Sequence, residues 1–169
     1  NLLARKGYRE IYAVRTLGIG MFRHIRYSDV KVTQILPSEP LGRIFDFSRD
    51  LIRRNLKMGY YDGLRVIRGL KGRKYCIKPV EEELMLRALY RVPEEQIGHL
   101  ASLFGLGQTG TRRMLLVKIL PEIGGKLGLK DDADFQDIVI NLLERLAEEQ
   151  ALPRYQIYEM KDFLTAIRE

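Results

Sequence analysis

The chain of 169 residues has a single cysteine, Cys76, which excludes an internal disulfide and is typical of a reducing cytoplasm. The chain has two histidines, His24 and His99. Together with Cys76 they are too few and too far apart in the sequence to form a metal-binding pattern. No run approaches the ~18 apolar residues that a membrane span needs, and no signal peptide is visible. We expect a cytoplasmic protein without a metal or other cofactor. Because the first residue is Asn1, we also expect a part of a longer chain.

The sequence also lacks the patterns of an enzyme site. The GIG segment at 18–20 is not followed by the Lys-Ser or Lys-Thr of a phosphate-binding loop. The acidic residues before Pro79 are dispersed, and their best pair, Asp46 and Asp50, is spaced as on an exposed helix face. The glutamates at 81–83 open a predicted helix, where they complement its positive end. A nuclease or nucleotide hydrolase is therefore an alternative only, and we predict that the protein is not an enzyme.

Charge is distributed unevenly along the chain. Residues 1–78 contain 18 Lys and Arg against 6 Asp and Glu, whereas residues 79–169 contain 11 against 16. A basic half joined to an acidic half favours a polyanion as partner of the first half. The alternative is a solvated basic face that binds nothing.

Residues 1–78 have the pattern of a small basic α+β subdomain. The segments EIYAVRTLGIGMF and VKVTQIL place Val, Ile, Tyr and Thr near period two, which predicts strands. Residues 43–59 have apolar side chains at helical spacing, and Gly59 is a plausible C-terminal cap. Residues 63–77 then resemble a β-hairpin turning at 69–72.

After Pro79 the pattern becomes helical to the end of the chain. Prolines and glycines separate the periodic segments, and we expect Pro121 with Gly124 and Gly125 to end the third helix. The predicted helices cover 79–92, 94–104, 108–120, 131–151 and 153–167. The fold class is therefore an α+β subdomain (1–78) followed by an all-α domain (79–169).

The second and third of these helices have the spacing of a helix-turn-helix, at about 94–120. Ala101 is the small residue at which the two helices would pack, and Gly105 follows at the turn. The apolar residues that would hold the pair are Ile97, Leu100, Phe104, Leu106 and Met114. The start of the third helix would enter a major groove, where Arg and Gln can contact base edges and Thr can contact phosphate. An ordinary helical hairpin has similar spacing, and Thr111 occupies a position that usually carries a β-branched aliphatic residue.

Three stretches in order resemble the central DNA-binding region of ParB-type partition proteins. PVEEELMLRALYRVPEEQIGHLASLFGLG (79–107) is similar to the family's "NPIEEA" helix and the helix-turn-helix of the form "QEEIAxxLGxS" that follows it. MLLVKILPEI (114–123) resembles "LLRLLxLPEEV", and LLERLAEEQALPRYQIYEMKDFL (142–164) resembles the segment ending "IxxxxLSVRxxExLV". The resemblance implies a helix-turn-helix domain that binds double-stranded DNA at a centromere-like inverted repeat. It also implies a dimer, nucleoid or plasmid association, and a ParA-type ATPase as partner.

Residues 1–78 resemble the ParB N-terminal domain in part, at Gly59, at 64–68 and at 75–77. The arginine-bearing "GERR" box that grips nucleotide phosphates in the family is missing, because the chain passes directly into KPVEEE. We therefore do not expect CTP binding.

The leading hypothesis is sequence-specific DNA binding in plasmid or chromosome partition. The candidate DNA contacts are Gln108, Thr109, Thr111, Arg112, Arg113 and Lys118, with Arg154 and Tyr155 as the second contact region that the resemblance implies. A transcriptional regulator with the same motif and a protein-interaction module are alternatives.

Overall fold

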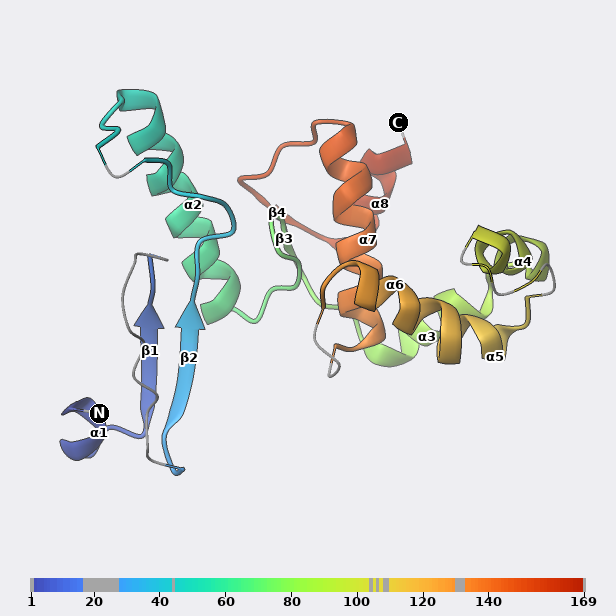
Figure 1. Cartoon of the computed structure of the whole chain (residues 1–169), viewed down its shortest axis with the longest axis horizontal. Coiled ribbons are helices and arrows are strands. Elements are labelled where there is room, and N and C mark those ends of the chain that lie inside the picture. The colour runs from blue at the N-terminus through green and yellow to red at the C-terminus, as the bar shows by residue number, and fades with distance from the viewer. Residues whose placement is uncertain are drawn as a thin grey trace. The chain divides into compact units, whose positions relative to one another are not determined.

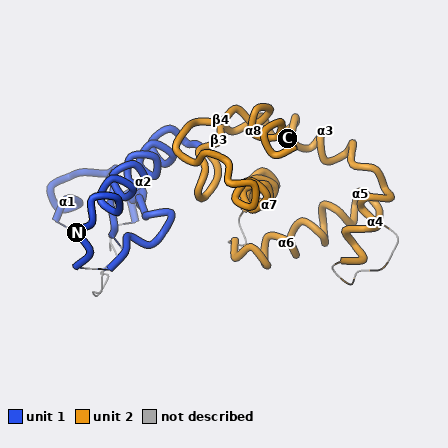
Figure 2. Tube along the Cα trace, turned by 90° about the horizontal axis from the view of Figure 1, so that it is seen from above, with its two compact units in different colours: residues 1–70 blue, residues 71–169 orange. Residues whose placement is uncertain are grey.

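The computed structural model describes residues 2–16, 28–43, 45–103, 105, 107, 110–129 and 133–168. The chain divides into two compact units, Asn1–Leu70 and Lys71–Glu169 (Figure 2). This division lies earlier than the boundary near residue 78 that the sequence suggested. No helix within the described residues is both long and apolar enough to cross a membrane.

The described part of the first unit contains two strands and two helices. A short helix α1 (Leu2–Arg5) precedes β1 (Glu10–Val14), and β1 pairs in parallel with β2 (Lys31–Ile35), with Glu10 opposite Lys31 (Figure 1). Both strands lie inside segments predicted to be extended. Lys31 Nζ lies 3.1 Å from Glu10 Oε1, so an exposed ion pair matches the register.

Helix α2 (Arg49–Ile67) is the longest element of the first unit. The sequence analysis ended this helix at Gly59 and placed a strand over 64–68, and both predictions are wrong. The helix continues because its second half is anchored: buried Asp62 accepts hydrogen bonds from Ser38 N and Arg65 Nη2, at 2.9 and 2.8 Å. An interior glycine costs only about 1 kcal/mol, which such contacts can offset.

The C-terminus of α2 is set by Gly69, whose φ is +63°. Leu70 N donates to the carbonyl of Arg65, and Gly69 N to that of Val66. These two bonds form a Schellman motif, in which glycine takes the left-handed position just beyond the helix. The true helix-ending glycine therefore lies ten residues after the one chosen from the sequence.

The second unit consists mainly of helices, and a small two-stranded sheet joins a segment near its beginning to one near its end. β3 (Cys76–Ile77) pairs in parallel with β4 (Ile157–Tyr158), while Lys71 and Ile77 form an isolated antiparallel bridge. The predicted hairpin over 63–77 is therefore wrong, because its first half is helix and β3 pairs with a distant strand. The prediction of helix alone after Pro79 is also wrong at β4.

The helices of the second unit follow the predicted segments closely at α3, α4 and α7. They differ more at the third helix and at the last one, which was predicted from residue 153 and begins only at Met160. In order they are α3 (Glu82–Tyr90), α4 (Glu94–Leu103), α5 (Arg112–Met114), η1 (Leu115–Ile119, a π-helix), α6 (Leu120–Lys126), α7 (Phe135–Glu149) and α8 (Met160–Arg168).

The third helix does not end at Pro121. It runs through α5, η1 and α6 from Arg112 to Lys126, and Leu120 N donates to the carbonyl of Leu115, five residues earlier. Proline lacks an N–H and collides with the carbonyl four residues before it in a regular helix. The widened turn lies directly before Pro121, which occupies the first turn of α6, where a missing donor is tolerated.

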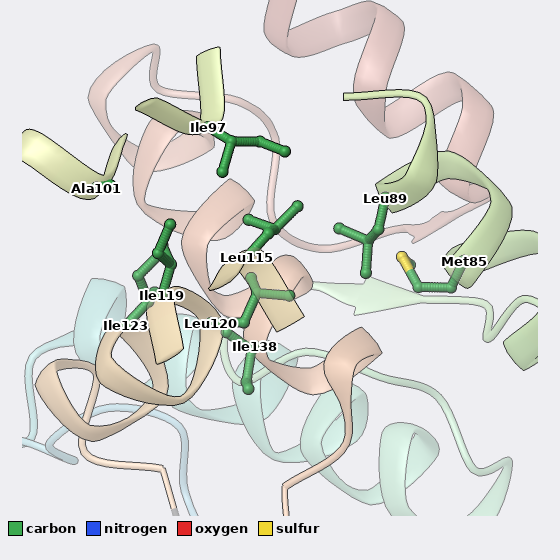
Figure 3. Packing of buried hydrophobic residues seen from close by; sticks show 9 residues of the cluster. All are labelled: Met85, Leu89, Ile97, Ala101, Leu115, Ile119, Leu120, Ile123 and Ile138. Atoms are coloured by element: carbon green, nitrogen blue, oxygen red, sulfur yellow. The ribbon is translucent and has the colours of Figure 1, made fainter. Parts of the chain in front are cut away.

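Two apolar clusters hold the second unit together. The larger one joins α3, α4, the third helix and α7 through Met85, Leu89, Ile97, Ala101, Leu115, Ile119, Leu120, Ile123 and Ile138 (Figure 3). The other packs the small sheet against α7 and α8 through Tyr75, Ile77, Ile140, Ala147, Tyr158 and Phe163.

Polar contacts fix helix α7 at its start and again at Glu144. Asp134 and Asp137 form a capping box at its start, and Lys71 Nζ bonds to both carboxylates, at 2.7 and 2.8 Å. Farther along, buried Glu144 accepts backbone hydrogen bonds from Arg73, Lys74 and Tyr75. The acidic helix start was predicted from the sequence, and the role of Glu144 was not.

Candidate nucleic-acid interface

Helix α4 and the third helix pack against each other as the helix-turn-helix prediction requires. Ile97 and Ala101 of α4 are fully buried, and they join the cluster that contains Leu115 and Ile119 (Figure 3). Of the predicted contacts, Leu100 and Met114 are partly buried against this cluster, whereas Phe104 and Leu106 lie outside the described residues. The sequence analysis did not name Leu115 and Ile119, because it located the third helix by its first and last residues and did not assign its buried face.

The turn between the two helices contains glycines in the left-handed region. Gly105 has φ +70° and Gly107 has φ +96°. Residues with a side chain rarely adopt such φ angles, so the sequence correctly identified these residues as turn glycines. Gln108 and Thr109, two of the predicted DNA contacts, lie outside the described residues.

Gly110 lies directly against the backbone of α4. A Cβ atom built on Gly110 would lie 2.4 Å from both Gly98 N and Ile97 C. Only glycine can occupy this position while the turn rests directly on the backbone of α4. In the sequence, Gly110 stands between two threonines, and Gly98 lies in the segment that forms α4. Only the packing of the turn on α4 shows why position 110 has to be glycine.

Thr111 is the N-cap of the third helix. Its Oγ1 accepts a hydrogen bond from Met114 N at 3.2 Å, and its backbone is extended. This capping explains why threonine stands where an aliphatic β-branched residue was expected, because among β-branched residues only threonine has a side-chain oxygen that accepts a hydrogen bond from the free amide of the first turn. The Thr111 side chain thus has a structural partner within the helix.

Arg112 is directed back toward α3 rather than left unpaired. Its Nε donates to the carbonyl of Tyr90 at 2.9 Å, and its Nη1 lies 3.8 Å from Glu94 Oε1. Tyr90 is the last residue of α3, and a cation at a helix C-terminus interacts favourably with the helix dipole. The side chain therefore ties the start of the third helix to the junction of α3 and α4.

Arg113 and Lys118 are exposed on the third helix. Within the described part of the chain, the Arg113 guanidinium has no ion-pair or hydrogen-bond partner. Lys118 lines an open hollow together with Val117, Pro121, Glu122, Gly125 and Lys126. These two cations are therefore the predicted contacts of this helix whose charge is available to an external anion.

Arg154 and Tyr155 lie in the segment between α7 and β4, and both are half-buried. Tyr158 Oη donates to the Pro153 carbonyl at 2.6 Å, and Tyr75 Oη to that of Leu152 at 3.2 Å, which fixes this segment on the smaller apolar cluster. Figures 1 and 2 both show it on the opposite side of α7 from α4 and α5. The structure does not bring Arg154 and Tyr155 together with Arg113.

The electrostatic contrast between the units is weaker than between the halves compared at residue 78, because the four cations at 71–78 belong to the second unit. The first unit has 14 Lys and Arg against 6 Asp and Glu, and the second has 15 against 16. Among the described residues, no group of three His, Cys, Asp or Glu is placed to hold a metal ion.

No protein-family model, no curated protein and no solved structure matches the chain. The interpretation of α4 and the third helix therefore depends on their own geometry and on the motifs quoted above.

Proposed function

We propose that the second unit binds double-stranded DNA at a specific sequence, with residues 94–126 as a helix-turn-helix. The observation that carries this proposal is the contact of Gly110 with the backbone of Ile97 and Gly98. It fixes the turn on α4 and starts the third helix at Arg112, with Arg113 exposed in its first turn. In known helix-turn-helix proteins this part of the second helix contacts base edges.

The residues divide into three roles under this proposal. Arg113 contacts a base edge, for which a guanidinium and the two acceptors of guanine are well matched. Lys118 contacts phosphate, which contributes affinity without sequence information. Arg112 positions the helix through Tyr90 and Glu94. Gln108 and Thr109 keep the roles assigned to them from the sequence.

The biological setting that the ParB resemblance suggests is plasmid or chromosome partition in the cytoplasm. The DNA would then be an inverted repeat bound by a dimer, and a ParA-type ATPase would be the protein partner. A transcriptional regulator would use the same geometry. Bound sites clustered beside a partition operon favour the first role, and a single promoter site favours the second.

The test is selection of bound sequences from random duplex DNA by the full 169-residue chain, followed by affinity measurements on the enriched site. We expect Arg113→Ala to weaken specific binding by about 1–3 kcal/mol. The control is Arg87→Ala on α3, whose exposed guanidinium pairs with Glu83 at 2.6 Å. Equal affinities for Arg113→Ala and the unchanged chain would refute the assignment, and absence of any salt-sensitive DNA binding would refute the proposed function.

A further inference from the structure

Val117 is the one exposed branched aliphatic side chain of the third helix. The structure describes every residue from Arg112 to Lys126, and within this range Val117 is 63% exposed. The other aliphatic side chains and the methionine are buried in the larger apolar cluster or packed against it, and they are Met114, Leu115, Leu116, Ile119, Leu120 and Ile123. The packing of this helix within the second unit therefore leaves Val117 outside the core.

The stability of the third helix does not account for a valine at this position. A β-branched residue loses side-chain freedom in a helix and is a weaker helix former than alanine. With most of its side chain exposed, Val117 also gains little from burial. The side chain therefore contributes more to a contact surface than to the folding of this helix.

Val117 lies on the same side of the third helix as Arg113 and next to Lys118. One turn takes about 3.6 residues in an α-helix, and the hydrogen bond of a π-helix such as η1 spans five. The residues four and five positions after Arg113 therefore both lie on its side of the helix. All three side chains are exposed, and Val117 and Lys118 line the same open hollow. An apolar side chain is thus flanked by two cations on the face that the proposed function directs toward DNA.

The apolar group that base pairs present in the major groove is the C5-methyl group of thymine. A short aliphatic side chain can contact it, whereas the hydrogen-bonding groups of other base edges would be left unpaired against a valine. The flanking cations suit the same surface, because phosphates border the groove. A protein partner suits Val117 less well, because one aliphatic side chain between two cations does not form the apolar patch of a protein interface.

We propose that Val117 contacts the C5-methyl group of a thymine and so determines part of the DNA sequence that the chain recognises. This inference rests on the proposed function and adds one base to the recognised site. Four residues of helix rise about 6 Å, and successive base pairs are stacked about 3.4 Å apart. The thymine therefore lies within about two base pairs of the guanine that Arg113 contacts.

The first experiment replaces each thymine of the selected site in turn by uracil and measures the affinity of the full chain for each duplex. Uracil lacks only the C5-methyl group and keeps the hydrogen-bonding groups of thymine. One replacement should weaken binding about fourfold, as expected for one methyl-sized apolar group. The sensitive thymine should lie within about two base pairs of the position at which Arg113→Ala loses its base preference.

The second experiment tests whether Val117 is the residue that contacts this methyl group. Val117→Ala should bind the thymine site at least about fourfold more weakly and should no longer distinguish thymine from uracil there. Alanine is the better helix former, so the variant should remain folded, which thermal unfolding followed by circular dichroism checks. The matched control is Leu84→Ala, which shortens an exposed aliphatic side chain of α3 and should keep both the affinity and the discrimination.

Two results would overturn this inference and leave the proposed function intact. One is specific binding in which no replacement of thymine by uracil near the Arg113 position weakens the complex. The other is a Val117→Ala chain that still distinguishes thymine from uracil, which would assign the methyl contact to another residue. Absence of specific DNA binding by the unchanged chain would instead refute the proposed function, and this inference with it.

Discussion

Arg112 donates a hydrogen bond from Nε to the backbone carbonyl of Tyr90 across 2.9 Å. This bond joins the first residue of the third helix to the last residue of α3. Neighbouring arginines in one sequence motif thus have different surroundings, since Arg112 is tied to the protein and Arg113 is exposed. A base contact and a positioning contact can therefore be separated by experiment.

Arg112→Ala should lower the free energy of unfolding by about 0.5–1.5 kcal/mol, because it removes a half-exposed, charge-assisted hydrogen bond. Arg113→Ala should leave it within about 0.5 kcal/mol, as is usual for an exposed residue without a partner. Urea denaturation followed by circular dichroism measures both. Equal destabilisation by the two substitutions would contradict the distinction drawn between them.

Gly110→Ala should destabilise the second unit by about 1–3 kcal/mol, because its Cβ would overlap the backbone of Ile97 and Gly98. The matched control is Gly125→Ala in α6, where a Cβ meets no atom within 4 Å. That substitution should be neutral or stabilise by up to about 1 kcal/mol, since alanine favours the helix. Thermal and urea unfolding of both variants test the prediction, which fails if Gly110→Ala is as stable as the control.

Glu144→Gln should cost about 2–3 kcal/mol of unfolding free energy. The buried carboxylate accepts backbone hydrogen bonds from Arg73, Lys74 and Tyr75, and an amide would direct its own N–H groups toward some of these donors. Glu149→Gln, at an exposed position of the same helix, is the control and should change stability by less than about 0.5 kcal/mol. A Glu144→Gln chain as stable as this control would show that the backbone contacts contribute little.

The free energy of unfolding should fall in acid as the Asp134 carboxylate becomes protonated. Burial alone would raise the pKa of Asp134, but the hydrogen bonds from Lys71 Nζ and the Asp137 backbone outweigh it, so this pKa lies below its usual 3.8. A carboxyl with a lowered pKa stabilises the fold above its unfolded pKa, and this contribution disappears as pH falls through the folded pKa. The free energy of unfolding should therefore decrease below about pH 4.

The matched substitutions for this acid response are Lys71→Gln and Lys126→Gln. Lys71→Gln removes the cation that lowers the Asp134 pKa, so its stability should depend less on pH in this range. Lys126→Gln breaks an exposed pair with Glu122 and leaves Lys71 in place, so it should keep the full dependence. Urea unfolding at a series of pH values measures this, and identical acid profiles for the two variants would exclude the role given to Lys71.

Local patterns in the sequence predicted the helices with strong caps and continuous apolar faces. Helix α7 has an acidic start with a capping box, and α4 begins directly after Pro93, so both were placed within a few residues. The end of α2 was missed because Gly59 and Gly69 are equally suited to end a helix on local grounds. The choice between them is made by tertiary contacts of Asp62 and by the hydrogen bonds around Gly69.

The candidate site was predictable in its outline and not in its contacts. Ala101 and the turn glycines at 105 and 107 follow from residue size and backbone freedom, and the structure places them as expected. The hydrogen bond from Arg112 to Tyr90 and the close packing of Gly110 on α4 depend on how the helices are oriented relative to one another, which a single sequence does not specify. For the same reason the sequence could not place the second contact region, Arg154 and Tyr155, relative to the third helix.

The pairing of β3 with β4 bears on the order in which the second unit folds. Cys76 lies near its beginning and Ile157 near its end, so this contact closes a loop that contains almost the whole unit. Loop closure over long separations is entropically costly, and such contacts form after local helices. During synthesis, α3 to α7 can therefore assemble first, and the small sheet can form only once residues 157–158 have left the ribosome. The native state of this unit is then reached in a late, cooperative step that joins its two ends.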